Sequence, residues 1–223
     1  MNKLSGQFIS AIHDYQYLME RHYAEKSTLK LVSDRYALSG EERSVLFRGV
    51  ITKEVVKKRK NKLIARPESG SSFIIDGYNV IRTVGSYLTG NLVFVAMDGF
   101  IRDVSEIHKK SVKDDIVFRA VDLILVTLKS LQPINVLFYL DMPVSKSGEL
   151  ADYISRSLSS QELTGNAETV HSPDHHLKKA EMGIVCTSDS VIIDECHLSV
   201  FDLARRTLDL HFSPEFICLT DST

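Results

Sequence analysis

Four short apolar runs in the second part of the chain each end on an aspartate, and helical patterns separate them. The runs are SFIID at 72–76, NLVFVAMD at 91–98, INVLFYLD at 134–141 and GIVCTSD at 183–189. Runs of this length, rich in β-branched and aromatic residues, are typical of buried strands. The clearest helical patterns between them cover 114–131 and 149–160. Strands that alternate with helices predict an α/β fold with a mostly parallel central sheet covered on both faces.

The segment 81–99 departs from this order. Its sequence is IRTVGSYLTGNLVFVAMDG, in which two apolar runs flank Thr89-Gly90-Asn91. Two strand-like runs around a short turn with glycine are typical of a hairpin. We therefore expect a hairpin inserted into the α/β order here.

The first sixty residues show helical periodicity. Apolar residues recur at helical spacing through FISAIHDYQYLM and LKLVSDRYAL, and a third pattern opens at Ser39 with Glu42 three residues later. That pair predicts a capping box, followed by one helix through RSVLFRGVITKEVV into KKRKNK. The stretch ARPESGSS is typical of a linker. We predict a small all-α domain over 1–65, a linker over 66–72 and the α/β domain over 73–223.

Composition narrows the class of protein. The chain has 223 residues and 43% hydrophobic content, enough to bury a core, and no apolar run reaches the ~18 residues of a membrane helix. Asp14 interrupts the stretch where a signal peptide would be apolar, so we expect no export signal. The cysteines are few and show no pairing pattern, which favours a reducing cytoplasm over a disulfide framework.

The net charge of −2 conceals an asymmetry. Residues 1–70 hold 14 Lys and Arg against 8 Asp and Glu, whereas residues 71–223 hold 13 against 21. A basic first part and an acidic second part suggest separate electrostatic roles, although each is also what an ordinary solvated surface would show.

The strand-end aspartates are the candidate chemical groups. In a parallel α/β sheet the ligand site lies at the carboxyl ends of the strands, so Asp76, Asp141 and Asp189 should converge there. Asp98 ends the remaining run, and Asp174 opens a predicted helix after Pro173. Carboxylates that converge repel one another unless cations neutralise them, and oxygen ligands favour Mg²⁺ or Mn²⁺. For each aspartate, the alternative is a helix cap or a turn.

Two further residues complete this interpretation. Gly77 would let the backbone turn sharply after Asp76, and Asn79 would orient water or phosphate. One or two cations held by carboxylates activate water and stabilise the leaving oxygen of a phosphodiester. The pattern therefore favours metal-assisted phosphodiester hydrolysis.

Four segments in this order, FIIDGYNVI, INVLFYLD, ETVHSPDHHLKK and GIVCTSDSVIID, resemble the NYN branch of the PIN-like ribonucleases over roughly residues 72–200. The resemblance implies a three-layer Rossmann-like fold, an RNA substrate, Mg²⁺ or Mn²⁺ as cofactor, and an architecture that commonly forms homodimers. It also implies roles for single residues: Asp76, Asp174, Asp189 and Asp194 as metal ligands, Asn79 as the motif asparagine and Asp141 as a further acid. The first part, with DRYALSGEERSVLFRGV, is similar to a helical domain of unknown function found fused to such PIN-like domains in archaeal and bacterial proteins.

Several candidate phosphate contacts remain open from the sequence. Ser145, Lys146 and Ser147 follow Asp141 at a helix start, where backbone N–H groups can cradle a phosphate or the helix can simply be capped. Arg102 lies in an insertion that has no counterpart in the NYN motifs, where it either holds a phosphate or belongs to a surface salt-bridged loop. The basic run Lys57, Lys58, Arg59 and Lys60 is either a charged helix end or an RNA-backbone contact.

Other side chains give weaker signals. His171, His175 and His176 suggest zinc, but adjacent histidines on a helix point apart, so a solvated helix start is favoured. Asp115 and Asp122 on the 114–131 helix are candidates for one more site acid, and the sequence does not choose between them. Two other functions stay open: a non-catalytic RNA-binding or interaction module, and a phosphohydrolase acting on small phosphorylated molecules.

Overall fold

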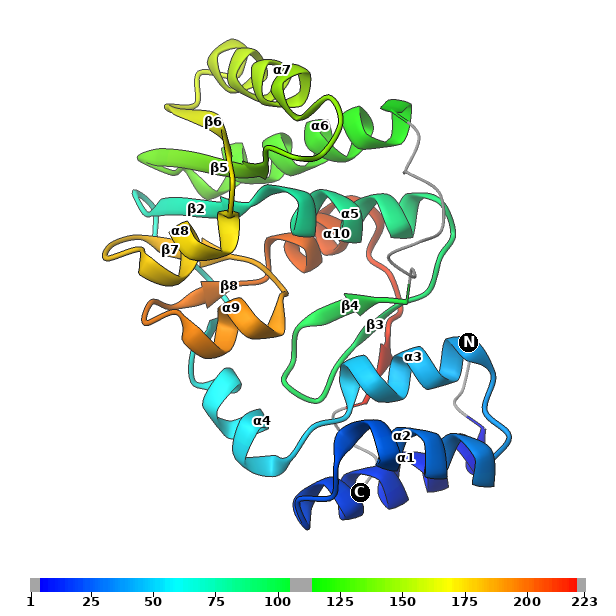
Figure 1. Ribbon diagram of the computed structural model, residues 1–223. Helices are drawn as coiled ribbons and strands as arrows, with labels where there is room; N and C mark the ends of the chain where they lie inside the picture. Colours follow the sequence, from blue (N-terminus) through cyan, green and yellow to red (C-terminus); the bar gives the residue numbers. More distant parts are fainter. Residues whose placement is uncertain (1–4, 105–113, 220–223) are drawn as a thin grey trace. The chain divides into compact units, whose positions relative to one another are not determined.

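The computed structural model describes residues 5–104 and 114–219 (Figure 1). Within these ranges the chain forms two compact units. The helical unit comprises residues 5–61, 91–104 and 215–219, and the sheet unit comprises residues 62–90 and 114–214. This division differs from the expected one at residues 66–72, because two later segments of the chain pack with the N-terminal helices.

A six-stranded, all-parallel sheet forms the centre of the sheet unit, as the α/β prediction required. Its strand order is β1-β8-β7-β2-β5-β6. The strands are β1 (Leu63–Ile64), β2 (Ser72–Asp76), β5 (Asn135–Asp141), β6 (Gly165–Val170), β7 (Ile184–Cys186) and β8 (Val200–Phe201). The central strands are the apolar runs of the sequence, and Phe73, Ile75 and Phe138 are fully buried. The edge strand β6, GNAETV, is polar, and its pattern did not predict a strand.

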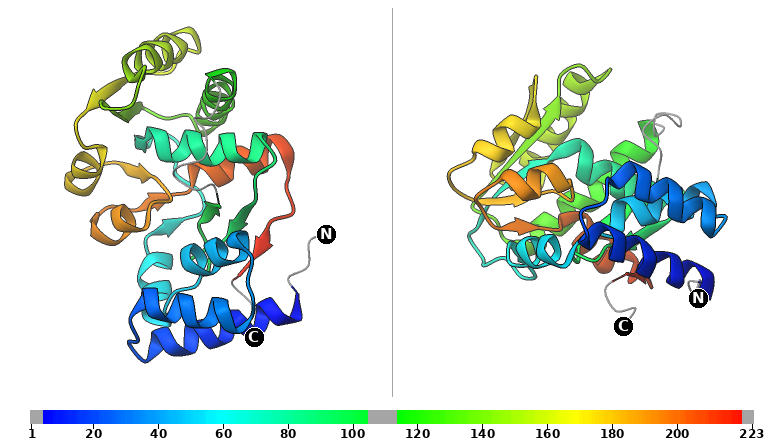
Figure 2. Two further views of the ribbon diagram at one scale, coloured as in Figure 1. Left: turned by 45° about the vertical axis from the view of Figure 1, so that its right-hand side comes forward. Right: turned by 60° about the horizontal axis from the view of Figure 1, so that its bottom comes forward.

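Helices connect these strands. They are α5 (Gly77–Leu88), α6 (Asp114–Leu131), α7 (Ser147–Ser160), α8 (Pro173–Lys179), α9 (Ser190–Glu195) and α10 (Leu203–Phe212). Helices α5, α6 and α10 pack against one another, and α5 and α10 lie side by side in both views of Figure 2. Helix α8 contacts β2, β5 and α9, so α8 and α9 stand beside the strand ends that carry the aspartates.

Residues 77–88 form helix α5, so the prediction of a hairpin at Thr89-Gly90-Asn91 is wrong. Val80, Ile81 and Val84 are buried at helical spacing, and this packing outweighs the β-branched composition that suggested a strand. The hairpin of this region lies later in the chain, around Asp98 and Gly99.

The helical unit combines four N-terminal helices with a three-stranded sheet. The helices are α1 (Gly6–Glu20), α2 (Glu25–Arg35), α3 (Gly40–Gly49) and α4 (Lys53–Lys60), and the strands are β3 (Val93–Val95), β4 (Ile101–Asp103) and β9 (Ile217–Cys218). Strand β3 pairs with β4 antiparallel and with β9 parallel. Phe94, Met97 and Leu219 share one core with α1, α2 and α3. The expected all-α domain therefore contains a small sheet.

The third helical pattern is two helices rather than one. The predicted capping box is present, since Ser39 and Glu42 exchange hydrogen bonds at the start of α3. The helix ends at Gly49, where an added Cβ would come within 2.5 Å of side-chain atoms of Phe94 and Leu219. Thr52 then caps α4 by accepting a hydrogen bond from the N–H of Val55. None of the helices in the described ranges combines the length and apolar character that a membrane span requires.

Candidate active site

The carboxyl ends of neighbouring parallel strands bring the predicted aspartates to one edge of the sheet. Strand β2 ends on Asp76, its neighbour β5 ends on Asp141, and β7 on its other side leads directly into Thr187-Ser188-Asp189. Asp174 lies in the first turn of α8, with Pro173 at the first helical position as predicted. We call Asp76, Asp141, Asp174 and Asp189 the acidic edge.

Asp76 is the buried member of the acidic edge, with 7% of its surface exposed. Its Oδ2 accepts a hydrogen bond of 2.8 Å from the Thr187 hydroxyl. Burial raises the pKa of this carboxyl from 3.8 to about 7, and the negative charges of Asp189 and Asp174 add to the increase, against the opposing effect of Thr187. Asp76 therefore lies within electrostatic reach of two other acids of the edge.

Asp189 also serves as a helix cap. Its Oδ1 accepts hydrogen bonds from the backbone N–H groups of Val191, at 2.8 Å, and Ile192, at 3.2 Å. Its own N–H donates to the Thr187 hydroxyl oxygen at 3.0 Å. Thr187 thus bridges the two acids, because it donates to Asp76 and accepts from the backbone of Asp189.

Asn79 joins the first turn of α5 to the loop that follows β7. Its Oδ1 accepts hydrogen bonds from the Ser188 N–H, at 2.8 Å, and from the Ser188 hydroxyl, at 3.1 Å. Its carbonyl oxygen is therefore engaged in holding the 187–189 loop, while its amide NH₂ keeps the donor capacity that a phosphate or water requires. Thr187 and Ser188 stood in the T-S-D motif of the sequence but were not predicted as site residues.

Asp141 and Asp174 interact at the β5 side of the edge. Partial burial raises the pKa of Asp141, the charge of Asp174 raises it further, and the guanidinium of Arg82 opposes both. Arg82 is exposed on α5, with its guanidinium 5.7 Å from the ring centroid of Tyr78, four residues earlier. Sequence reasoning missed this cation and this phenol, although their i, i+4 spacing after Asp76 would place both on one side of a helix.

Glycine is needed at position 77, but not for the sharp backbone turn that the sequence suggested. A Cβ added at Gly77 would lie 2.8 Å from the carbonyl oxygen of Tyr139 and 2.6 Å from Cδ2 of Leu140. Glycine is therefore required because the start of α5 approaches β5 closely, and not for a sharp turn.

The side chains of the acidic edge suit a hard cation that keeps most of its water ligands better than a site formed entirely by protein ligands. Carboxylate and amide oxygens are the ligands of Mg²⁺ and Mn²⁺. Within residues 5–104 and 114–219, no three His, Cys, Asp or Glu side chains are grouped so as to hold a metal ion. Mg²⁺, however, commonly keeps several waters and uses only one or two protein carboxylates. The buried Asp76 and the adjacent Asp189 are the residues suited to such a site.

Asp194, the remaining predicted metal ligand, belongs to helix α9. It sits near the end of the short helix α9, whereas Asp189 caps the beginning of that helix. At this end, the ammonium of Lys62 donates to the carbonyl oxygens of Ile193, Asp194 and Cys196. A metal-binding role for Asp194 stays a prediction.

Two predicted phosphate contacts are engaged in a buried ionic cluster of the helical unit. Arg59 from α4 and Arg102 from β4 both bind Oδ2 of Asp98, at 3.1 and 2.9 Å, and all three residues are buried. Asp98 is thus the acid of the β3–β4 turn and does not end a strand of the large sheet. Neither arginine stands as a surface contact for phosphate.

The remaining basic candidates are exposed. Lys58 pairs with Glu54 at 2.7 Å, and Lys57 and Lys60 lie on the same helix α4. Lys146, in a left-handed conformation before α7, pairs with Asp114 at 2.6 Å.

The remaining predicted site residues are two serines after Asp141 and two aspartates of α6. Ser145 is exposed, and the buried Ser147 hydroxyl donates to the Met142 carbonyl at 3.1 Å. Asp122 accepts a 2.6 Å hydrogen bond from the Tyr153 hydroxyl, and Asp115 is exposed. The structure gives no contact between these acids of α6 and the acidic edge.

Comparisons with known proteins agree with a two-part chain. A family model described as "Domain of unknown function (DUF5616)" matches residues 67–206, and one described as "Protein of unknown function (DUF434)" matches residues 7–62. The "Uncharacterized protein MJ0935" of Methanocaldococcus jannaschii is 33% identical over 201 residues, which cover 89% of this chain and 95% of that relative. No solved structure matches the chain.

Proposed function

The chain belongs to the family described as a domain of unknown function (DUF5616), and for this member we propose a metal-dependent ribonuclease that hydrolyses RNA phosphodiester bonds at the acidic edge. The observation that carries the proposal is the buried carboxyl of Asp76, whose pKa is raised to about 7 beside Asp189 and Asp174. Burial of this acid costs stability once the carboxyl is ionised, and groups with strongly perturbed pKa values are concentrated at functional sites.

We assign the cation to Asp76 and Asp189, with Asp174 and Asp141 as surrounding acids. When bound, Mg²⁺ or Mn²⁺ supplies Lewis-acid polarisation of a phosphoryl oxygen and lowers the pKa of water. Thr187 fixes the Asp76 carboxylate through its 2.8 Å hydrogen bond. The NH₂ group of Asn79 is our candidate donor to the scissile phosphate.

Asp141 is our candidate for proton transfer. It lies at the end of β5, and its raised pKa makes it a better base than an ordinary surface aspartate. Arg82, whose charge acts on Asp141, is the cation available on α5 to face a phosphate near this acid. These roles, together with the order of the D-G-Y-N and T-S-D motifs, support assignment of the sheet unit to the NYN-type PIN-like fold.

A non-catalytic RNA-binding or interaction module is the second candidate. It is favoured by the finding that no three potential ligands are grouped around a metal position in the described ranges. The basic run that this alternative requires is reduced, however, because Arg59 is buried against Asp98 and Lys62 binds carbonyl oxygens of α9.

The decisive test is calorimetric titration with Mn²⁺, with cleavage of a structured RNA measured on the same samples. We compare the wild type with Asp76→Asn and with the control Asp152→Asn, which removes an exposed acid of α7. We expect saturable Mn²⁺ binding and cleavage in the wild type and the control, and loss of both in Asp76→Asn. Cleavage that survives Asp76→Asn in a folded protein would refute the proposal, and RNA binding that is indifferent to chelator and unaccompanied by cleavage would favour the second candidate.

A further inference from the structure

A pocket of 380 Å³ adjoins the acidic edge on its β6 side. It is lined by Met142, Thr169, Val170, His171, Ser172, His175 and His176. Met142 directly follows Asp141, and Val170 is the register partner of Asp141 across the β5–β6 pair. The volume falls near the lower end of the ~300–1,000 Å³ typical of small-molecule sites. The pocket therefore stands where a group attached to a substrate at the acidic edge would reach.

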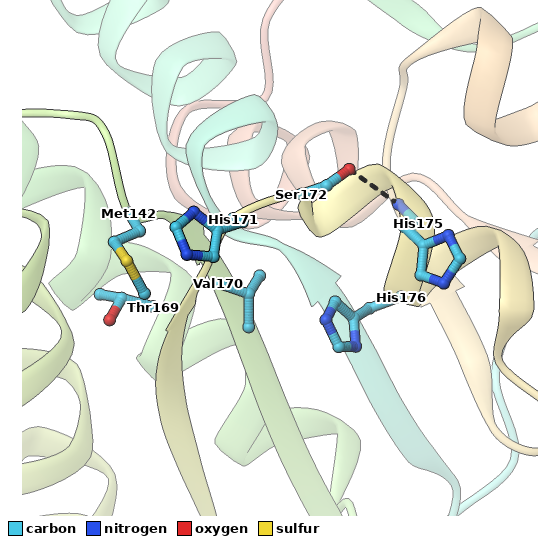
Figure 3. Close-up of a pocket in the computed structure, with 7 residues that line it drawn as sticks. All are labelled: Met142, Thr169, Val170, His171, Ser172, His175 and His176. Carbon is cyan, nitrogen blue, oxygen red and sulfur yellow. Dashed lines mark hydrogen bonds between the residues drawn. The ribbon is translucent and has the colours of Figure 1, made fainter.

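Figure 3 shows how the side chains are arranged around this pocket. Val170 lies between the imidazole rings of His171 and His176, whereas His175 points away from Val170. The ring of Tyr139, from β5, stacks on His176 with a centroid distance of 4.8 Å and an interplanar angle of 30°. Tyr139 thus braces the His176 ring that lines the pocket, and the two rings form a ready stacking platform.

The chemistry of the lining selects a flat ligand without negative charge. None of the lining residues is Lys or Arg. Two acids are close to lining residues in the sequence: Asp141 directly precedes Met142, and Asp174 directly precedes His175. An anion would be repelled by these carboxylates, whereas an aromatic heterocycle would stack on an imidazole and contact Met142 and Val170. The hydroxyls of Thr169 and Ser172 offer hydrogen bonds to the edge of such a ring.

We propose that this pocket is a nucleobase subsite that holds one unstacked base of single-stranded RNA over Val170, flanked by His171 and His176. Stacking of splayed bases on aromatic side chains is the usual way proteins grip single strands. The choice of RNA as the carrier of the base rests on the proposed function, whereas the preference for a flat heterocycle rests on the pocket alone. The phosphodiester beside the bound base then runs toward the acidic edge.

The test measures binding of the four uncharged ribonucleosides to the full chain in EDTA, by NMR titration of the imidazole Cε1–H signals. We expect saturable shifts of the His171 and His176 signals with at least one nucleoside. His176→Leu should weaken this binding about five-fold or more, since stacking on one aromatic partner contributes at least that factor. His197→Leu, which removes an exposed histidine after α9, is the matched control and should leave it unchanged, and His171→Leu provides a second disruptive variant if His176→Leu unfolds.

The outcomes separate this subsite from the nuclease proposal. Nucleoside binding in EDTA that persists in Asp76→Asn, without any RNA cleavage by the wild type, would support the subsite and refute the nuclease. Mn²⁺-dependent cleavage whose KM is unchanged in both His176→Leu and His171→Leu, with no nucleoside-induced shift, would overturn the subsite and leave the nuclease standing. Equal loss of nucleoside binding in His197→Leu and His176→Leu would also overturn the stacking arrangement.

Discussion

The carboxyl of Asp76 lies buried at the end of β2, in a position that costs folding free energy. The Thr187 hydroxyl and the backbone N–H of Asn79, both neutral groups, donate to it, and the charges of Asp189 and Asp174 add to the effect of burial on its pKa. A neutral hydrogen bond offsets only part of the desolvation of a carboxylate. Asp76 is therefore a residue whose structural cost calls for a functional explanation.

This cost predicts a specific pH dependence for the metal-free protein. The unfolded chain releases the Asp76 proton near its ordinary pKa of 3.8, whereas the folded protein keeps it until about pH 7. The Asp76 contribution to stability is therefore fully present below about pH 4 and is lost as pH rises to about 7. The full loss corresponds to roughly 4 kcal/mol.

Asp76→Asn removes this titration and keeps an oxygen that accepts from Thr187. We expect the variant to be more stable than the wild type at pH 8, and to lose most of that advantage at pH 4.5. Urea unfolding in EDTA at both pH values measures the difference. The same experiment on Asp152→Asn should give a difference that hardly changes with pH. A pH-independent difference for Asp76→Asn would show that its carboxyl titrates normally.

At this scale the sequence predicted part of the site. Asp76, Asp141, Asp174 and Asp189 could be identified because each follows an apolar run or opens a helix, and strand direction alone then brings them together. The partner of Arg59 could not be predicted, since Arg59 and Asp98 are 39 residues apart and no local pattern connects them, whereas Arg102 lies only four residues from Asp98. The metal-binding role expected for Asp194 stays a prediction, since its spacing from Asp189 does not fix the direction of its side chain.

At the scale of elements, burial decided what the sequence could predict. Strands β2, β5 and β7 are covered on both faces and appear as continuous apolar runs. The edge strand β6 is half exposed and polar, so it carried no such signal. Residues 81–88 of α5 were mistaken for a strand because Ile81, Thr83 and Val84 are β-branched, and only their burial within the sheet unit shows the helical period.

The junction of β2 and α5 gives a prediction at this scale. Gly77→Ala would place a methyl group 2.8 Å from the Tyr139 carbonyl oxygen, so α5 or β5 must shift. We expect a loss of about 1–3 kcal/mol in unfolding free energy, as for an overpacked core. Weaker Mn²⁺ binding should accompany it, because Asp76 directly precedes the displaced residue.

Gly148→Ala is the matched control for this change. Gly148 lies in the first turn of α7, and an added Cβ there meets nothing within 4 Å. We expect its unfolding free energy to stay within about 0.5 kcal/mol of the wild type, or to rise, since alanine favours helix more than glycine. Chemical denaturation of the three proteins provides the comparison. Equal stability of the two variants would contradict the close approach of Gly77 to β5.

At the scale of the whole molecule, the boundary seen along the sequence does not coincide with the division into the two compact units. The two family models meet between residues 62 and 67, in line with the linker-like sequence there. The helical unit nevertheless takes β3, β4 and β9 from beyond that point, and β1 of the sheet unit lies in the gap between the two matches. No composition signal marks residues 91–104 as part of the first unit, because their β-rich sequence resembles that of the large sheet.

A cut at the linker should therefore damage both units. A fragment of residues 1–65 lacks Phe94, Ala96, Met97 and Leu219 of the helical core. Each large apolar side chain that is fully buried contributes about 1.5–3 kcal/mol, against a total stability of about 5–15 kcal/mol for a domain. A fragment of residues 66–223 lacks β1, which pairs with β8, and Lys62, which binds the end of α9.

We expect neither fragment to unfold cooperatively when followed by circular dichroism during heating, whereas the full chain should. The informative control follows the observed division: residues 62–214, with 91–109 replaced by a short Gly-Ser linker, retain all six strands of the large sheet and the acidic edge. This protein should unfold cooperatively and bind Mn²⁺ as the full chain does. A cooperative transition in the 1–65 fragment would contradict this prediction. It would mean that α1 to α4 form a stable core without β3, β4 and β9.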